Sequence, residues 1–150
     1  VYKRQAQHPH HFVYRGSEVQ TTGNPLTHVV LRGAVSKHGN TTQNYHYEDL
    51  IRLHDMYAKM DVVNPAAIID TNHSNSGKKF KEQIRIAREV MHNRQLSSDI
   101  RGLVKGLMIE SYIEPGNQKV GDGVYGKSIT DACLGWAESE KLLYDIADLA

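Results

Sequence analysis

A strand-like apolar run that ends in a dense polar cluster is the feature that most constrains the fold of this chain. Residues 66–69 read Ala-Ala-Ile-Ile, and the next seven positions, Asp70 to Ser76, read Asp-Thr-Asn-His-Ser-Asn-Ser. Buried polar groups cost free energy unless they are hydrogen-bonded or bind a ligand. So much hydrogen-bonding chemistry at the end of one strand therefore indicates a site as well as a fold.

Two further apolar runs repeat this pattern. Residues 28–31 lead into Arg32 and Gly33, and residues 106–109 lead into Glu110. The carboxyl ends of parallel strands meet at one edge of a sheet, where α/β folds bind their ligands. The three runs therefore predict β/α units whose strand ends share one site.

Composition limits the class of protein without identifying it. The chain has 150 residues, enough for one domain or a piece of a larger one, with 39% hydrophobic residues and a formal net charge of +1. This charge excludes the basic excess of a general nucleic-acid binder. The single cysteine excludes an intrachain disulfide and fits a reducing compartment, so we expect a cytoplasmic protein. No apolar stretch is long enough to span a bilayer, and no membrane partner is expected.

The periodicity of apolar residues predicts β-hairpin, β, α, β, α, β, loop, α. The expected elements are a hairpin with strands at 12–14 and 18–21, a strand at 28–32, a helix with Tyr47, Leu50, Ile51, His54 and Tyr57 on one face, a strand at 66–70, a helix at 77–94 capped by Ser76, a strand at 106–110, a glycine-rich loop at 115–127 and a helix at 138–149. Such alternation implies a parallel sheet covered by helices. Three strands alone leave bare edges, whereas a closed barrel has eight.

The faces of the two later helices are also predicted. The helix at 77–94 places Phe80, Ile84, Ala87, Val90 and Met91 inward, and its run of lysines and arginines is expected to face solvent. The last helix is expected to turn Leu142, Leu143, Ile146 and Leu149 inward.

His73, Glu110 and Asp131 are the candidate metal ligands. Imidazole with two carboxylates suits Mn²⁺, Fe²⁺, Co²⁺ or Zn²⁺. The three lie far apart in the sequence and would converge only if their strands are parallel neighbours. The alternative stays open, since a histidine at a strand end often caps a loop or donates to a carbonyl.

Arg32 is the candidate anion-binding residue. It closes an apolar strand, and a planar guanidinium suits phosphate or carboxylate. An internal salt bridge to a neighbouring strand explains it equally well. Cys133 is interpreted as a small buried cysteine rather than a ligand, and the histidines at 8, 10 and 11 as part of a surface loop.

Five motifs stand in order along the chain and together resemble one family. They are Leu31-Arg32-Gly33, the run from Ile69 to Ser76, Met108-Ile109-Glu110-Ser111, Gly116-Asn117-Gln118, and the run from Tyr125 to Asp131. From about Pro9 onward the chain resembles the C-terminal part of type I 3-deoxy-7-phosphoheptulonate synthase (DAHP synthase). We expect residues 1–8 to be a ragged or artefactual N-terminus and 9–150 to be part of one barrel domain.

The resemblance implies an α/β fold, the C-terminal portion of a (β/α)8 barrel, and a transferase that condenses phosphoenolpyruvate with erythrose 4-phosphate and releases phosphate, the first step of the shikimate pathway. It implies that His73, Glu110 and Asp131 bind a divalent metal, that His73 and Asp131 thereby serve catalysis, and that Arg32 binds phosphoenolpyruvate. The full-length protein is expected to be a homo-oligomer.

The chain also departs from the family pattern. The family's fourth ligand is a cysteine in the N-terminal half, followed by a Lys-Pro-Arg-Thr-type sugar-phosphate motif, and neither occurs here. We therefore expect about half of an active site and no activity from this chain alone. The alternatives are the related 3-deoxy-octulosonate 8-phosphate synthase and a non-catalytic half-barrel module that binds phosphate.

Overall fold

A three-stranded parallel sheet with helices on one side forms the body of the molecule. The computed structural model describes residues 6–150. Its elements are β1 (His11–Tyr14), β2 (Ser17–Gln20), β3 (Val29–Leu31), β4 (Ala34–Val35), β5 (Thr41–Thr42), α2 (Tyr47–Ala58), β6 (Ala67–Asp70), α3 (His73–Ser76), α4 (Glu82–Leu96), α5 (Ser98–Leu103), β7 (Val104–Met108), β8 (Glu114–Asn117), β9 (Lys127–Ser128) and α6 (Trp136–Leu149).

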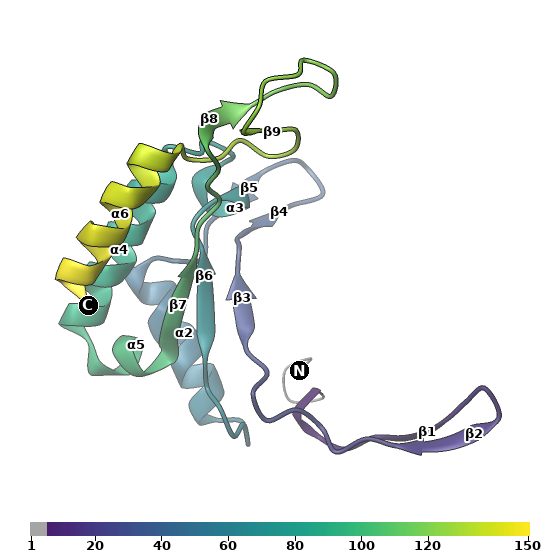
Figure 1. Cartoon of the computed structure of the whole chain (residues 1–150). Helices are drawn as coiled ribbons and strands as arrows, with labels where there is room; N and C mark the ends of the chain where they lie inside the picture. The colour runs from purple at the N-terminus through teal and green to yellow at the C-terminus, as the bar shows by residue number, and fades with distance from the viewer. Residues whose placement is uncertain (1–5) are drawn as a thin grey trace.

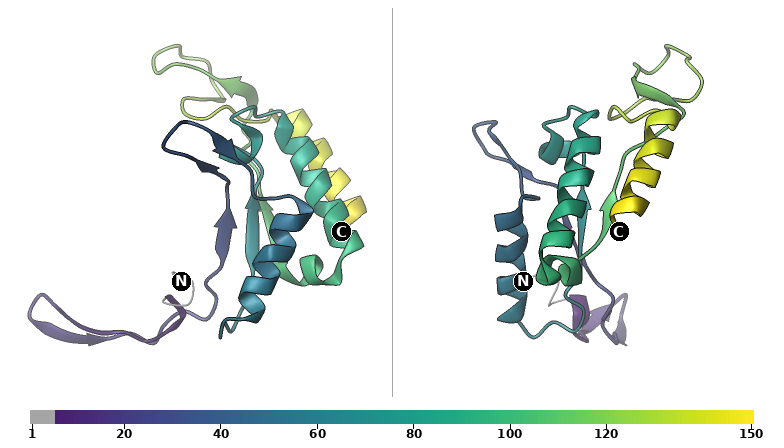
Figure 2. Two further views of the ribbon diagram at one scale, coloured as in Figure 1. Left: turned by 180° about the vertical axis from the view of Figure 1, so that it is seen from behind. Right: turned by 90° about the vertical axis from the view of Figure 1, so that its left-hand side faces the viewer.

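The central sheet has the order β3-β6-β7, and both pairings are parallel. Helices α2, α4 and α6 lie on the same side of this sheet, and its other side is open (Figures 1 and 2). The expected parallel sheet with covering helices is confirmed. All three strands run in one direction, so their carboxyl ends lie along one edge.

The core lies between the sheet and the helices. Ile69 of β6 is fully buried there. Side chains alternate between the two faces of a strand, and on the opposite face Val30 is exposed and Ile68 is half-buried. The main cluster of buried residues comprises Tyr45, Leu50, Tyr57, Ala67, Ile69, Ile86, Val90, Ile100, Leu103 and Val104. A smaller cluster of Ala87, Leu134 and Leu142 joins α4 to α6.

The predicted hairpin is confirmed, with a shorter turn than expected. β1 and β2 are antiparallel, and Tyr14 pairs with Ser17, so only Arg15 and Gly16 form the loop. Both have positive φ, +50° and +76°, as a two-residue type I′ turn requires. The hairpin projects away from the body of the molecule (Figure 1).

The segment after the polar cluster differs from the prediction. Ser76 does not cap a helix at 77–94; it is the last residue of the short helix α3, and α4 begins at Glu82. Gly77 and Lys78 have φ of +59° and +62°, which no right-handed helix can accommodate. Of the inward residues predicted here, Ala87, Val90 and Met91 are buried, and Phe80 and Ile84 pack half-buried against the smaller cluster.

Three smaller differences concern the start of β7, the glycine-rich loop and the buried face of α6. A helix that the sequence did not predict, α5, ends at Leu103, so β7 starts at Val104 and finishes before Glu110. The glycine-rich loop contains the short parallel pair β8 and β9. Leu143 is 63% exposed because α6 packs mainly against α4 and buries only the side that carries Leu142.

Much of the ragged N-terminus predicted for residues 1–8 lies outside the described residues, which begin at Ala6. No helix between residues 6 and 150 is both long and apolar enough to cross a bilayer.

Gly33 and Gly77 provide a matched test of this geometry. Both have positive φ, but a Cβ on Gly33 would lie 2.7 Å from the Thr42 carbonyl oxygen and 2.8 Å from Ser74 Cβ, whereas Gly77 faces open space. We expect Gly77→Ala to cost about 1 kcal/mol from backbone strain. Gly33→Ala should cost about 1–3 kcal/mol more, because the neighbouring backbone must also move.

Urea denaturation of the two variants measures this difference in the free energy of unfolding. Equal losses of stability would contradict the close packing of Gly33 against the loop that carries Ser74.

Candidate metal centre

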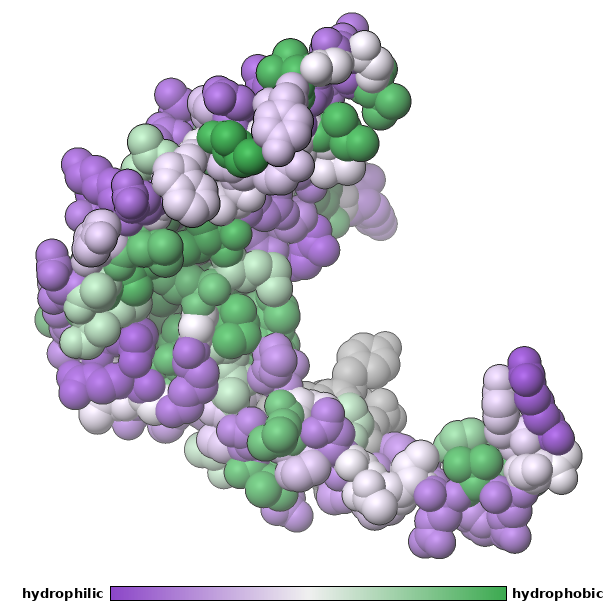
Figure 3. Space-filling model, viewed as in Figure 1, coloured by the Kyte–Doolittle hydropathy of each residue, from purple (hydrophilic) through white to green (hydrophobic). Residues whose placement is uncertain are grey.

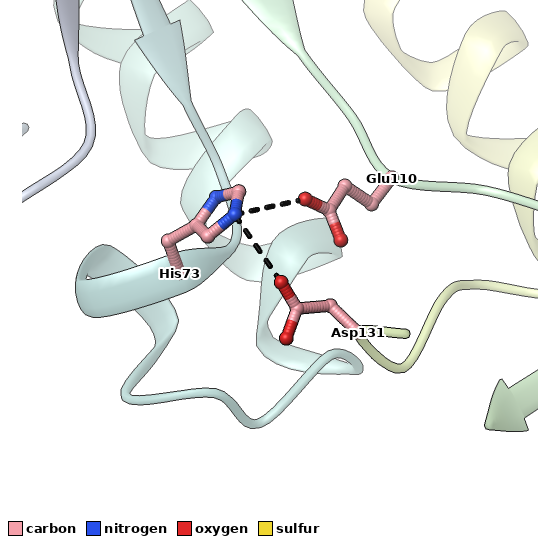
Figure 4. A group of neighbouring side chains, drawn as sticks. All are labelled: His73, Glu110 and Asp131. Atoms are coloured by element: carbon pink, nitrogen blue, oxygen red, sulfur yellow. Dashed lines mark ion pairs between the residues drawn. The ribbon is translucent and has the colours of Figure 1, made fainter. Parts of the chain in front are cut away.

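The fold brings the three predicted ligands together. His73 Nε2 lies 3.2 Å from Glu110 Oε1 and 3.4 Å from Asp131 Oδ2. One ligand atom from each residue lies within 4.8 Å of the other two. In Figure 4 the imidazole points toward both carboxylates. His73 follows β6, Glu110 follows β7 and Asp131 follows β9. The convergence expected from parallel strands is therefore present.

A buried carboxylate orients the His73 ring. Asp70 Oδ2 lies 2.7 Å from His73 Nδ1, and the Asp70 side chain is only 2% exposed. Its other oxygen accepts a hydrogen bond from the Asn72 backbone N–H. A proton on Nδ1 that is shared with Asp70 leaves Nε2 directed at Glu110 and Asp131, the arrangement usual for histidines that bind metals.

This donor set fits a divalent cation. An Nε2 lone pair and two carboxylate oxygens that point at one place repel one another unless a proton or a cation lies between them. Two states satisfy the geometry: an imidazolium paired with the surrounding carboxylates, or a neutral imidazole that shares a cation with Glu110 and Asp131. Imidazole and carboxylate together suit Mn²⁺, Fe²⁺, Co²⁺ and Zn²⁺.

The backbone of His73 is held in an uncommon conformation. Its φ is +43°, in the left-handed region, where a residue with a side chain costs about 1–2 kcal/mol. The His73 carbonyl accepts a hydrogen bond from the Lys78 N–H, and the Ser76 N–H donates to Asn72. These bonds close a tight loop around His73 and stabilise the strained residue.

Asn72 connects Glu110 with the segment of Asp131. Its Nδ2 donates to Glu110 Oε2 at 2.9 Å and to the Ala132 carbonyl at 3.3 Å. Its Oδ1 accepts from Ser76 Oγ. Because Asn72 is 3% exposed, these bonds are shielded from water, and the Glu110 carboxylate keeps one oxygen free to face His73.

Arg32 lies at the end of the neighbouring strand β3. Its side chain is exposed, and within residues 6–150 it forms no ion pair or side-chain hydrogen bond, so the internal salt bridge is not observed. Asn75 fixes the backbone beside it: Asn75 Nδ2 donates to the Leu31 carbonyl and to the Asp70 carbonyl. The same amide accepts from Asn44 N–H, and Asn44 Oδ1 accepts from Gly33 N–H.

Cys133 is half-buried rather than buried and lies outside the His73, Glu110 and Asp131 group. Its thiol donates to the Asp131 carbonyl, and desolvation raises its pKa. It lines a pocket of about 330 Å³ together with Tyr112 and Lys127.

Sequence reasoning missed the residues that hold the ligands. Asp70 and Asn75 were visible only as members of a polar cluster, and Asn44 lay in a polar loop. Their hydrogen bonds join residues up to 44 positions apart, as between Asn75 and Leu31. Spacing along one chain does not reveal such bonds; the dense polar run after β6 was the available signal.

The chain is similar to known proteins over most of its length. The model of the family described as DAHP synthetase I matches residues 3–144. The Trp-sensitive phospho-2-dehydro-3-deoxyheptonate aldolase of Enterobacter agglomerans is 42% identical over 132 residues, which are 86% of this chain and 35% of that protein. The phospho-2-dehydro-3-deoxyheptonate aldolase of Haemophilus influenzae is 34% identical over 95% of this chain and 39% of its own length.

A solved structure agrees with these matches. The phospho-2-dehydro-3-deoxyheptonate aldolase of Francisella tularensis SCHU S4 superposes with a TM-score of 0.82 and 30% identity, over 97% of this chain and 42% of that one. The chain thus spans between a third and about two fifths of the length of these relatives. The family match covers nearly the whole chain, and we conclude that it belongs to the DAHP synthetase I family.

Proposed function

We propose that this chain forms the metal centre and part of the phosphoenolpyruvate site of a 3-deoxy-7-phosphoheptulonate synthase. Such an enzyme condenses phosphoenolpyruvate with erythrose 4-phosphate and releases phosphate. The observation that carries the proposal is the convergence of His73, Glu110 and Asp131 in a member of this family. The names of the similar proteins support the same reaction.

In this proposal His73, Glu110 and Asp131 are three ligands of one divalent ion. When bound, the ion acts as a Lewis acid that polarises the aldehyde of the sugar phosphate. Asp70 keeps the proton on His73 Nδ1, so that Nε2 remains available as a ligand. Asn72 holds the far oxygen of Glu110 and leaves the near one directed at His73.

Arg32 binds the phosphate of phosphoenolpyruvate. Its guanidinium has no competing partner among the described residues and can form two parallel hydrogen bonds to phosphate oxygens. Asn75 and Asn44 fix the backbone on either side of Arg32 to the loop that carries His73. These neutral amides set the relative position of the anion-binding and metal-binding residues.

The remaining strands of a (β/α)8 barrel would cover the open side of this structure. Among residues 6–150, no further strand pairs with the outer edges of β3 and β7, and parallel sheets rarely leave edges bare. On α6, Trp136, Leu143 and Tyr144 are each more than 60% exposed. Figure 3 shows an apolar surface beside this helix and β7. A neighbouring β/α unit would bury it.

The cellular location and the oligomeric assembly of the protein are also predicted. A cytoplasmic location follows from the single cysteine and the shikimate pathway, and assembly into a homo-oligomer follows from the family resemblance. The histidine and carboxylate donors accept Mn²⁺, Fe²⁺, Co²⁺ or Zn²⁺, so the physiological ion is to be identified by experiment.

His73→Asn tests the metal ligand. Asparagine tolerates the left-handed backbone but removes the imidazole, so we expect Mn²⁺ binding to fall sharply while the fold is retained. Isothermal titration calorimetry measures the affinity, and circular dichroism checks the fold. His38→Asn, at an exposed turn, is the matched control and should bind Mn²⁺ normally. Unchanged binding by His73→Asn would contradict the assignment.

Arg32→Ala tests the anion site. Losing a charge-assisted contact should weaken phosphoenolpyruvate binding about ten- to hundredfold. A ³¹P NMR titration with diamagnetic Zn²⁺ present provides the dissociation constant. Lys37→Ala removes an equally exposed positive charge from the β4–β5 loop and should have little effect. Equal losses in both variants would indicate only a general charge effect.

A chimera tests the reaction itself. The part of the Enterobacter agglomerans relative that precedes the matched region is joined ahead of this chain. Because the joined part would complete the barrel and supply the missing site residues, we expect erythrose 4-phosphate to trigger phosphate release from phosphoenolpyruvate. A phosphate-release assay measures this, and the same chimera with His73→Asn serves as the inactive control. A folded chimera that binds phosphoenolpyruvate without turnover would instead favour a phosphate-binding module.

A further inference from the structure

The backbone of Glu110 lies beyond the end of the sheet. β7 finishes at Met108, whose carbonyl accepts the last hydrogen bond from β6, donated by the Thr71 N–H at 3.0 Å. Two residues later, the Glu110 carbonyl accepts a hydrogen bond from the Leu134 N–H at 3.0 Å, beside an isolated bridge between Ser111 and Leu134. Among residues 6–150, no main-chain group accepts from the Glu110 N–H. The Glu110 N–H therefore depends on a side chain for its hydrogen bond, because main-chain polar groups away from water need partners.

Gln83 of α4 supplies that missing partner. Its Oε1 accepts a hydrogen bond from the Glu110 N–H at 2.8 Å, and its Nε2 donates to the Glu110 carbonyl at 3.0 Å. One side-chain amide thus binds both polar groups of a single residue, as a neighbouring strand would. Gln83 has no exposed surface, so water does not compete for these bonds.

The same amide also contacts the strand that leads to His73. Thr71 Oγ1 lies 3.0 Å from Gln83 Oε1 and 2.9 Å from the Met108 carbonyl. Thr71 follows Asp70, the carboxylate that orients the His73 ring. Gln83 therefore joins the segment of Glu110 to the segment of His73.

We propose that Gln83 is a positioning residue that fixes Glu110 opposite His73 and so sets the affinity of the metal centre. The inference rests on the proposed function, because it assumes that these side chains bind a divalent ion. Gln83 touches neither carboxylate nor imidazole and acts through the Glu110 main chain. Loss of its amide leaves the Glu110 N–H buried without a partner, a state that the segment relieves by moving.

Gln83→Met is the direct test, since methionine has a similar length and no strong hydrogen-bonding group. Partners that hold metal ligands in place are typically worth about ten- to hundredfold in metal affinity, and we expect a Mn²⁺ dissociation constant raised by that factor. Amide hydrogen exchange at Glu110 should also become faster. Gln83→Glu keeps an acceptor for the Glu110 N–H, although its carboxylate replaces the donor by a buried charge, so its Glu110 amide should remain better protected than in Gln83→Met.

Ile86→Ala is the matched control. Ile86 is also fully buried on α4, but it belongs to the main apolar core. Its truncation should lower the stability of the fold and leave the Mn²⁺ affinity of the folded fraction unchanged. Both variants are therefore titrated at a temperature where circular dichroism shows them folded.

The outcomes separate two failures. If the unsubstituted chain binds Mn²⁺ and Gln83→Met binds it equally well, or if Ile86→Ala weakens binding as much, the positioning role is wrong while the metal centre stands. If the unsubstituted chain binds no Mn²⁺, the proposed metal centre is wrong and this inference falls with it. A loss confined to the Gln83 variants, with faster exchange at Glu110, supports the inference.

Discussion

The buried carboxylate of Asp70 is the group on which the rest of the site depends. A buried charge persists only when it is paired and hydrogen-bonded, and Asp70 has both the His73 ring and the Asn72 N–H as partners. Its position at the end of β6, the middle strand, fixes where those partners must be. The tight loop and the left-handed His73 follow from this constraint, because the ring has to return toward the strand that precedes it.

Neutral amides, rather than further charges, connect the strand ends. Asn75, Asn72 and Gln83 are all buried, and each bridges two segments through its side chain. A side-chain amide can donate and accept hydrogen bonds at the same time. It is also neutral, so it adds no charge beside a bound cation. The resulting hydrogen bonds hold the segments that carry the candidate ligands. They leave the carboxylates of Glu110 and Asp131 as the charged groups that face His73 Nε2, while Asp70 pairs with Nδ1.

Much of the fold could be predicted from local pattern, and so could the meeting of His73, Glu110 and Asp131 at one edge of the sheet. Apolar runs such as residues 66–69 indicate buried strands, and Arg15-Gly16-Ser17 between two extended runs indicates a turn, because both signals depend on neighbouring residues. The interruption at Gly77 and Lys78 was missed because backbone φ in a polar loop has no periodic signature. Leu143 was assigned to the core because its spacing fits a helix face, whereas the partner that α6 meets decides which part of that face is covered. Gln83 carries no signal of its own in the sequence, because its partners Thr71 and Glu110 belong to other segments of the chain.

The separation of the three ligands along the chain has a consequence for stability. An ion shared by His73, Glu110 and Asp131 would act as a cross-link between segments that are otherwise joined by long stretches of chain. It would bind the folded state and not the unfolded one, and at a hundred times its dissociation constant such a ligand adds about 2.7 kcal/mol to the free energy of unfolding. The persistence of this fold in the cell would then follow the local supply of metal.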